Sequence, residues 1–302
     1  KIGAEITTDQ DLYCERYFHF IIETRAGEEL PSALGAEKIG TTTAEASIKV
    51  AGETLLLEDL IAAWTGTLEN TYPSKATVAH SELETFSYDA KPEAANINLG
   101  AAPKVIIPVF PGTNCEYDTA RAFRQAGADA ETFVFRNLTA AHVEESLTGL
   151  AEKISESQIL MLPGGFSAGD EPDGSGKFIA TVLRNPRVAD AVMSLLKDRD
   201  GLALGICNGF QALVKTGLVP YGEIRDPQAG APTLTFNDIG RHIACYATTR
   251  IASNKSPWLA GTEVGDLHNI AFSHGEGKFY ASEEDVKALA ANGQIATQYT
   301  DL

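Results

Sequence analysis

The chain of 302 residues has few cysteines and histidines, which argues against a disulfide-rich fold and against a histidine metal site. Its four cysteines form no CxxC pair and are too sparse for a disulfide framework, which favours a reducing, cytoplasmic compartment. The six histidines are scattered without paired spacing, and we read the acidic loop 170–174 as a solvated surface. The sequence therefore predicts no metal site.

Long apolar runs and an excess of positive charge are also lacking. No apolar segment reaches the length that spans a membrane, and no signal peptide is evident. The net charge of −17 argues against a nucleic-acid backbone or an anionic membrane as partner. Hydrophobic residues make up 44% of the chain, so we expect a folded protein with a sizeable core.

The chain divides into three parts by composition. Residues 1–87 are predicted to form a small α+β segment, with a β-rich stretch at 17–22 and apolar residues at helical spacing over 55–68. Residues 88–103, with two prolines and several alanines, are a predicted linker, and residues 104–302 form the main domain. The first residue is not methionine and the last follows a strand-like stretch. We therefore expect a fragment of a longer protein, truncated at its C-terminus.

The main domain alternates buried strands with helices. Strands are predicted over 104–110, 130–135, 158–162 and 202–206, and helices over 118–126, 140–154, 176–198 and the stretch after Cys207. Near-continuous apolar strands of this kind are typical of a mostly parallel sheet covered on both faces, so the predicted class is α/β. Such sheets bind ligands at the carboxyl ends of their strands, where loop 163–170 and Cys207 both lie.

Cys207 stands between a predicted strand and a predicted helix, with Gly205 and Gly209 on either side. A tight strand-to-helix turn exposes a nucleophile above the sheet, and the start of a helix favours the thiolate. The backbone N–H of Asn208 would stabilise an oxyanion, and we expect the N–H of Gly165, in the Pro-Gly-Gly loop, to be the second donor. The alternative is that Cys207 is a small core residue.

The other two cysteines of the main domain are weaker candidates for a nucleophile. Cys115 also follows a strand end but lacks the flanking glycines, so we favour a structural role or a place in the wall of the site. Cys245 alternates within a strand-like pattern and is expected in the core.

Five motifs carry a family resemblance: PGTNCEYD, LPGGFSAGD, GICNGFQAL, NKSPWL and SHGEGKF, in this order. Together they resemble the class I glutamine amidotransferase domain, of flavodoxin-like fold, and more closely the glutaminase part of the formylglycinamide ribonucleotide amidotransferase (phosphoribosylformylglycinamidine synthase) family. The resemblance covers about residues 103–302. The preceding stretch 57–73 resembles the end of the synthetase part in members that carry both parts on one chain.

The resemblance implies a reaction. Cys207 would attack glutamine, form a γ-glutamyl thioester and release ammonia, which travels to the synthetase portion of the parent chain for purine biosynthesis. That portion would use ATP and Mg, and no cofactor is implied for the present segment. Gln211 fits the family position that helps hold glutamine, and Phe166 is expected to border the pocket.

His274, Gly275 and Glu276 raise the question of the general base. Their His-x-Glu spacing would suit a catalytic triad. The resemblance instead places the triad in a later His-Pro-Glu-Arg motif, absent from this sequence, and makes 274–276 a wall of the glutamine site. We therefore expect weak turnover or none from the chain alone. Two alternatives remain open: another elbow-cysteine hydrolase of flavodoxin-like fold, and an inactive docking fragment.

Overall fold

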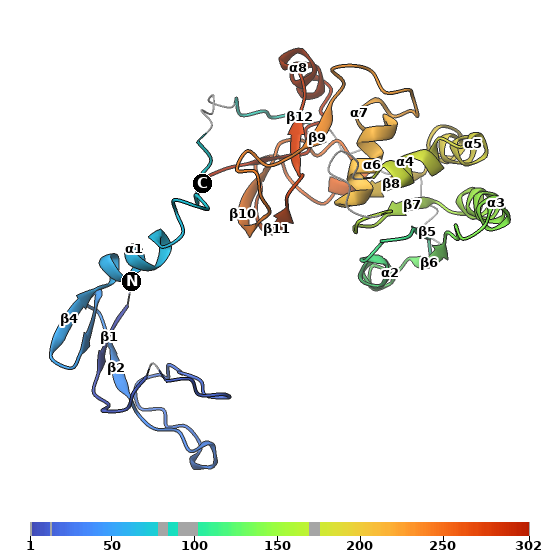
Figure 1. Ribbon diagram of the computed structural model, residues 1–302. Coiled ribbons are helices and arrows are strands. Elements are labelled where there is room, and N and C mark those ends of the chain that lie inside the picture. The colour runs from blue at the N-terminus through green and yellow to red at the C-terminus, as the bar shows by residue number, and fades with distance from the viewer. Residues whose placement is uncertain (1, 13, 78–83, 90–101, 169–175, 302) are drawn as a thin grey trace. The chain divides into compact units, whose positions relative to one another are not determined.

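The computed structural model describes residues 2–12, 14–77, 84–89, 102–168 and 176–301. They form two compact units, Lys1–Thr77 and Val78–Leu302 (Figure 1). Most of the predicted linker and the acidic loop 170–174 lie outside the described residues. No described helix is both long and apolar enough to cross a membrane.

The smaller unit is α+β, as predicted. A mixed four-stranded sheet has the order β2-β1-β3-β4, and helix α1, Leu57–Gly66, follows it within the predicted helical stretch. The strands are β1, Gly3–Ile6, β2, Gly40–Thr43, β3, Ser47–Val50, and β4, Glu53–Leu56, with a short 3-10 turn at Ser32–Leu34.

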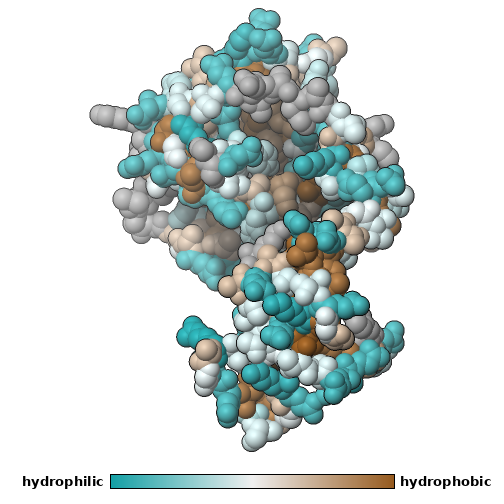
Figure 2. All heavy atoms as spheres, turned by 90° about the vertical axis from the view of Figure 1, so that its left-hand side faces the viewer, coloured by the Kyte–Doolittle hydropathy of each residue, from teal (hydrophilic) through white to brown (hydrophobic). Residues whose placement is uncertain are grey.

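The β-rich stretch 17–22 forms no strand, so that prediction was wrong. Phe18 is 94% exposed with a φ of 62°, a left-handed conformation that a strand residue does not adopt. Hydrophobic residues also reach the surface elsewhere among hydrophilic ones (Figure 2).

The larger unit is built on a parallel sheet of order β6-β5-β7-β8 (Figure 1). All three strand pairs are parallel, which confirms the predicted α/β class. The predicted strands are all present as β5, Lys104–Val109, β6, Asp129–Val134, β7, Ile159–Leu162, and β8, Leu202–Gly205.

Helices cover both faces of this sheet because its strands alternate apolar side chains between two cores. Ile106, Leu160 and Leu162 belong to the larger core, which receives helices α3, Ala140–Glu156, α4, Lys177–Leu183, α5, Pro186–Met193, its π-helical continuation Ser194–Asp198, and α6, Asn208–Thr216. Val105 and Met161 face the second core, which contains Ala120 and Phe123 of helix α2, Glu116–Gln125.

An antiparallel region completes the larger unit. Its three-stranded sheet has the order β11-β10-β13, and a two-stranded sheet pairs β12 with β9. The elements are α7, Leu218–Tyr221, β9, Thr233–Thr235, β10, Ile243–Ile251, a 3-10 turn at Pro257–Leu259, β11, Leu267–His274, β12, Lys278–Tyr280, α8, Glu283–Ala291, and β13, Thr297–Tyr299. Cys245 lies on a strand as expected but is exposed, so its predicted place in the core was wrong.

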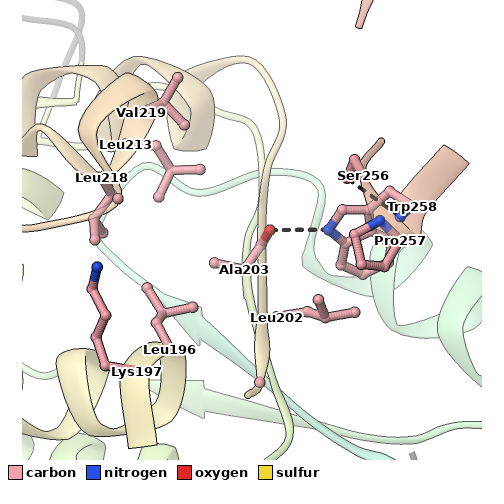
Figure 3. Close-up of a pocket in the computed structure, with 12 residues that line it drawn as sticks. Leu196, Lys197, Leu202, Ala203, Leu213, Leu218, Val219, Ser256, Pro257 and Trp258 are labelled. Atoms are coloured by element: carbon pink, nitrogen blue, oxygen red, sulfur yellow. Dashed lines mark hydrogen bonds between the residues drawn. The ribbon is translucent and has the colours of Figure 1, made fainter. Parts of the chain in front are cut away.

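A cavity of about 380 Å³ lies beside the amino end of β8. Apolar side chains line most of it, and Lys197 adds one charge (Figure 3). The indole Nε1 of Trp258 donates to the carbonyl oxygen of Ala203, at 3.2 Å (Figure 3). This cavity is at the opposite end of β8 from Cys207, and the site described below does not include it.

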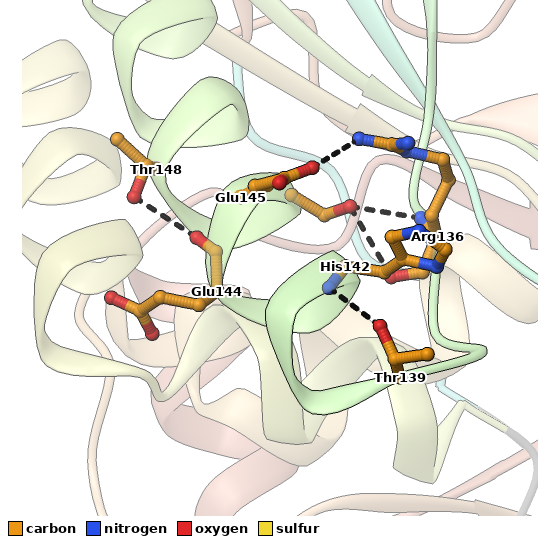
Figure 4. A network of polar contacts seen from close by, with 7 residues as sticks. Arg136, Thr139, His142, Glu144, Glu145 and Thr148 are labelled. Atoms are coloured by element: carbon orange, nitrogen blue, oxygen red, sulfur yellow. Dashed lines mark hydrogen bonds and ion pairs between the residues drawn. The ribbon is translucent and has the colours of Figure 1, made fainter.

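The turn after β6 is held to the first turns of α3 by polar contacts (Figure 4). The Ser146 hydroxyl accepts from the Arg136 N–H at 2.9 Å and donates to the Arg136 carbonyl oxygen at 3.2 Å. The Arg136 guanidinium pairs with Glu145, and the Thr139 side chain caps α3 by accepting from the His142 N–H. These contacts join groups of the protein to one another and fix where α3 begins.

Candidate active site

Cys207 occupies a strained turn between β8 and α6. Its φ of 53° and ψ of −111° lie outside the regions that non-glycine residues normally populate. Cys207 is exposed to solvent. Strain of this kind costs about 1–3 kcal/mol and is held only where the surrounding structure fixes it. Here β8 fixes one side, and the Gln211 N–H fixes the other by donating to the Cys207 carbonyl oxygen at 2.9 Å.

Gly209 explains how α6 can begin so close to the sheet. A Cβ on this residue would lie 2.0 Å from the carbonyl oxygen of Leu162, at the end of β7. Any side chain would therefore push the helix away from the strand ends. The predicted strand–Cys207–helix elbow is present, and Gly209 allows the backbone of α6 to lie against the end of β7.

The loop after β7 lies beside this elbow. Gly165 and Thr113 form an isolated antiparallel bridge, flanked by hydrogen bonds from Asn114 N–H to Gly164 O and from Phe166 N–H to Gly112 O, at 3.2 and 2.8 Å. In such a pattern the bridged residues are the non-hydrogen-bonded pair, so the N–H of Gly165 points away from Thr113. Its φ of 139° is open only to glycine.

Cys115, the N-cap residue of α2, lies close to Cys207. A Cβ built on Gly164 would be 3.3 Å from Cys207 Cβ and 3.5 Å from Cys115 Sγ, so both side chains border the same glycine. Burial raises the pKa of the Cys115 thiol, and negative charge on Cys207, Asp118 and Glu116 adds to the effect. Cys115 therefore lies in the wall of the site, one of the two roles its sequence suggested.

Side-chain amides connect the elbow to two loops. The Ser167 N–H donates to Asn208 Oδ1 at 3.2 Å, and Asn208 Nδ2 donates to Gln211 Oε1 at 3.3 Å. Gln211 Nε2 donates in turn to the carbonyl oxygen of Glu276 at 3.2 Å. Asn208 is only 3% exposed. The helix start, the Pro-Gly-Gly loop and the His-Gly-Glu loop thus meet around α6.

The His274 ring packs against a neighbouring aromatic side chain. It stacks on Phe272 with ring centroids 4.9 Å apart, and within the described residues its Nδ1 is buried without a hydrogen-bond partner. Burial lowers the pKa of His274, and the neighbouring His242 lowers it further. A neutral imidazole at neutral pH follows from these surroundings.

Asn237 holds the loop that His274 begins. Its Nδ2 donates to the carbonyl oxygens of His274 and Arg241, at 2.8 and 3.0 Å, and its backbone N–H donates to Gly275 O at 2.8 Å. Sequence reasoning missed Asn237 and the side chain of Asn208. Both are buried asparagines, and a polar residue within an apolar stretch is the only signal that could have marked them.

The predicted site residues fall into one region with different exposures. Phe166 follows Gly165 and is 52% exposed, so its ring is free to border a substrate. Glu276 is joined to the elbow helix by the Gln211 contact, and Gly275 is held by the backbone N–H of Asn237. Among residues that the structure describes, no group of three or more His, Cys, Asp or Glu side chains could hold a metal ion.

Residues 102–302 also resemble known proteins. A family model described as "CobB/CobQ-like glutamine amidotransferase domain" matches residues 102–302. A protein of Sulfurimonas denitrificans named phosphoribosylformylglycinamidine synthase subunit PurQ is 32% identical over 198 residues, which are 66% of this chain and 75% of that protein. Its namesake in Dehalococcoides mccartyi is 35% identical over 198 residues, covering 66% and 69%. The solved structure of PurLQS from Thermotoga maritima covers 61% of this chain and 72% of its own, with 24% identity and a TM-score of 0.45.

Proposed function

Because this chain belongs to the family of CobB/CobQ-like glutamine amidotransferase domains, we propose that it hydrolyses glutamine to supply ammonia for phosphoribosylformylglycinamidine synthesis. The observation that carries the proposal is Cys207, held at a φ of 53° between β8 and α6 at the carboxyl end of the sheet. A nucleophile in this position projects above the carboxyl edge of the sheet, where a substrate can reach it.

In the proposed reaction, the thiol of Cys207 loses its proton and the sulfur attacks the side-chain carbonyl carbon of glutamine. The negative charge on the oxygen is stabilised by the N–H groups of Asn208 and Gly165. Asn208 is the first residue of α6, so a helix leaves its N–H without an intrahelical acceptor. Each such donor contributes about 3 kcal/mol to transition-state stabilisation. The C–N bond then breaks, ammonia leaves with a proton, and water releases glutamate from the thioester.

We assign the glutamine-binding wall to Phe166, Gln211 and the loop of His274, Gly275 and Glu276. Support comes from the exposure of Phe166 and from the bond between Gln211 and Glu276 O. His274 is given a role in this wall rather than that of the base, because its ring is stacked on Phe272 and its buried Nδ1 has no partner among the described residues.

The ammonia would be used elsewhere. Two relatives are named as subunits of phosphoribosylformylglycinamidine synthase, and we propose that ammonia passes from Cys207 to a synthetase part on the same parent chain. That part would use ATP with Mg to activate the formyl amide oxygen of formylglycinamide ribonucleotide. No cofactor is assigned to the present chain.

A glutamine-analogue electrophile tests the nucleophile directly. Incubation of the 302-residue chain with a diazoketone analogue of glutamine should label Cys207 with one equivalent, detected by peptide mass spectrometry. Excess glutamine should slow the labelling, because both molecules compete for one pocket. Cys207→Ala should abolish labelling, and Cys115→Ala, which removes the neighbouring thiol, should leave Cys207 labelled.

Two results would contradict the proposal. Labelling that glutamine does not slow would favour another elbow-cysteine hydrolase. Labelling of Cys115 with Cys207 untouched would remove Cys207 from the nucleophile role. An ammonia-release assay beside it tests His274: turnover that His274→Gln abolishes, with labelling of Cys207 unchanged, would make His274 the base.

A further inference from the structure

The contacts from Ser167 through Asn208 and Gln211 to Glu276 form one continuous chain, here called the amide relay. Its direction is fixed at both ends. The Ser167 N–H can only donate, so Asn208 must present Oδ1 to it and Nδ2 to Gln211. The Glu276 carbonyl can only accept, so Gln211 must present Nε2 to it and Oε1 to Asn208. The two ends therefore demand the same orientation of both amides.

The relay occupies Asn208 and Gln211 with protein partners. Asn208 is 3% exposed, and a buried amide that lost its partners would be left unsatisfied at a substantial cost in stability. Gln211 uses its oxygen and one N–H within the relay. Gln211 is thus the residue of the glutamine-binding wall that ties loop 274–277 to α6, and the Asn208 side chain ties loop 163–168 to the same helix.

The relay also joins the two loops to which we assign separate tasks. Ser167 is two residues from Gly165, the proposed second oxyanion donor, and Glu276 belongs to the proposed glutamine-binding wall. Asn208 itself carries the first oxyanion donor on its backbone. One chain of hydrogen bonds thus joins the loop of the second donor, the residue that carries the first donor, and the wall. It runs along the first turn of α6, directly after Cys207.

We propose that Asn208 and Gln211 are positioning residues, with distinct effects on the reaction. The Asn208 side chain sets the Gly165 N–H beside its own backbone N–H, which governs the rate of the chemical step. Gln211 holds loop 274–277 against α6, which governs how tightly glutamine binds. This inference rests on the proposed function, because it takes both tasks from that mechanism.

Gln211→Glu and Gln211→Met test the wall. Glutamate keeps an acceptor for Asn208 but turns a carboxylate oxygen toward the Glu276 carbonyl, and methionine removes both bonds. Each should raise the concentration of glutamine analogue that half-saturates Cys207 labelling by about tenfold, with the labelling rate at saturation changed less than threefold. Gln294→Glu is the matched control, because Gln294 Nε2 also donates to a backbone carbonyl, that of Pro220. Gln294→Glu should keep the half-saturating concentration and the labelling rate of the parent chain.

Asn208→Leu tests the oxyanion loop. It should lower the labelling rate at saturation by about tenfold or more, since one misplaced donor is worth that much. The rate of Cys207 alkylation by iodoacetamide, which needs no oxyanion hole, should change less than twofold. If Asn208→Leu does not fold, the two Gln211 variants carry the test. Gln211 variants that match Gln294→Glu in half-saturation would overturn the inference.

Hydrogen exchange separates a failure of the relay from a failure of the proposed function. If glutamine does not slow labelling of the parent chain, the proposed function fails, but the relay can still be measured. Faster exchange in 274–280 for Gln211→Glu, with no change there for Gln294→Glu, would support a relay that holds the loop. Unchanged exchange in 274–280 would overturn it.

Discussion

Cys115 and Cys207 border the same residue: a Cβ on Gly164 would lie 3.5 Å from the sulfur of the first and 3.3 Å from the Cβ of the second. The three residues come from the carboxyl ends of β5, β7 and β8, which are neighbours in the sheet. Two cysteine side chains from neighbouring strand ends therefore approach the same glycine.

The first prediction concerns the pH at which Cys115 reacts. Because burial and the neighbouring Cys207 raise its pKa, Cys115 should remain a thiol at neutral pH and be alkylated slowly by iodoacetamide. Its alkylation, followed by peptide mass spectrometry from pH 6 to 11, should have a midpoint above the ordinary value of about 8.5. Cys207→Ala should move that midpoint downward by removing one source of negative charge. A midpoint at or below the ordinary value in the parent chain would contradict this reading of the site wall.

A methyl group at position 164 should disturb the site more than the fold. Gly164→Ala would bring its Cβ within tight contact of Cys207, and we expect labelling by the glutamine analogue to slow by roughly tenfold, since small misplacements in a site are costly. Gly261→Ala is the control, because a Cβ there meets nothing within 4 Å. Equal labelling rates for the two variants would show that a methyl group at position 164 does not disturb Cys207.

His274 should make stability depend on pH. Its pKa is lowered in the folded state, first by burial and then by His242, so the unfolded chain binds a proton more readily. Stability contributed by the neutral ring is complete above about pH 6.5 and is lost as the pH falls through the lower, folded-state pKa. Urea unfolding between pH 7 and 5 should therefore show a decline that His274→Gln reduces.

An NMR titration checks the same shift without unfolding. The His274 ring should titrate below pH 6.5, and His242→Gln should raise its midpoint. A His274 midpoint at or above 6.5 would remove the physical basis of the predicted decline.

Asn237 is predicted to support loop 274–277 through its hydrogen bonds to the first residues of that loop. Asn237→Leu removes the two side-chain hydrogen bonds to His274 O and Arg241 O, and should lower the free energy of unfolding by about 2 kcal/mol. It should also speed hydrogen exchange in the loop. Asn254→Leu replaces another buried asparagine, whose Nδ2 makes a longer bond of 3.4 Å to Thr262 O. Faster exchange at 274–277 in both variants would mean general loosening rather than loss of a specific support.

The sheet of the larger unit could be predicted from sequence because its strands are continuous apolar runs. Val105, Ile106 and Ile107 are at most 1% exposed although they face opposite sides, which is the property that distinguishes a doubly covered strand. The elbow was predictable for a similar reason, since glycines and a cysteine between a strand and a helix form a local pattern. Helix bounds were also close, because capping residues such as Thr139 act locally.

Features set by distant contacts could not be predicted in the same way. The stretch 17–22 has strand-like residues, but the structure gives them no pairing partner. Composition alone therefore predicted a strand that does not form. Cys245 alternates as expected of a strand, yet its sheet leaves that side open to solvent. The bonds of Asn237 and Asn208 span 37 and 41 residues in sequence, and no local pattern specifies such pairings.

Trp258 bears on how the protein resists aggregation through the edge of its parallel sheet. β8 is the last strand in the order β6-β5-β7-β8, and such a strand offers free carbonyls to any passing β-segment. The indole of Trp258 already takes the Ala203 carbonyl and packs edge-on against Phe123, with ring centroids 6.3 Å apart. A strand of another molecule would have to displace the Trp258 ring before it could pair with β8. Trp258 therefore opposes edge-to-edge aggregation.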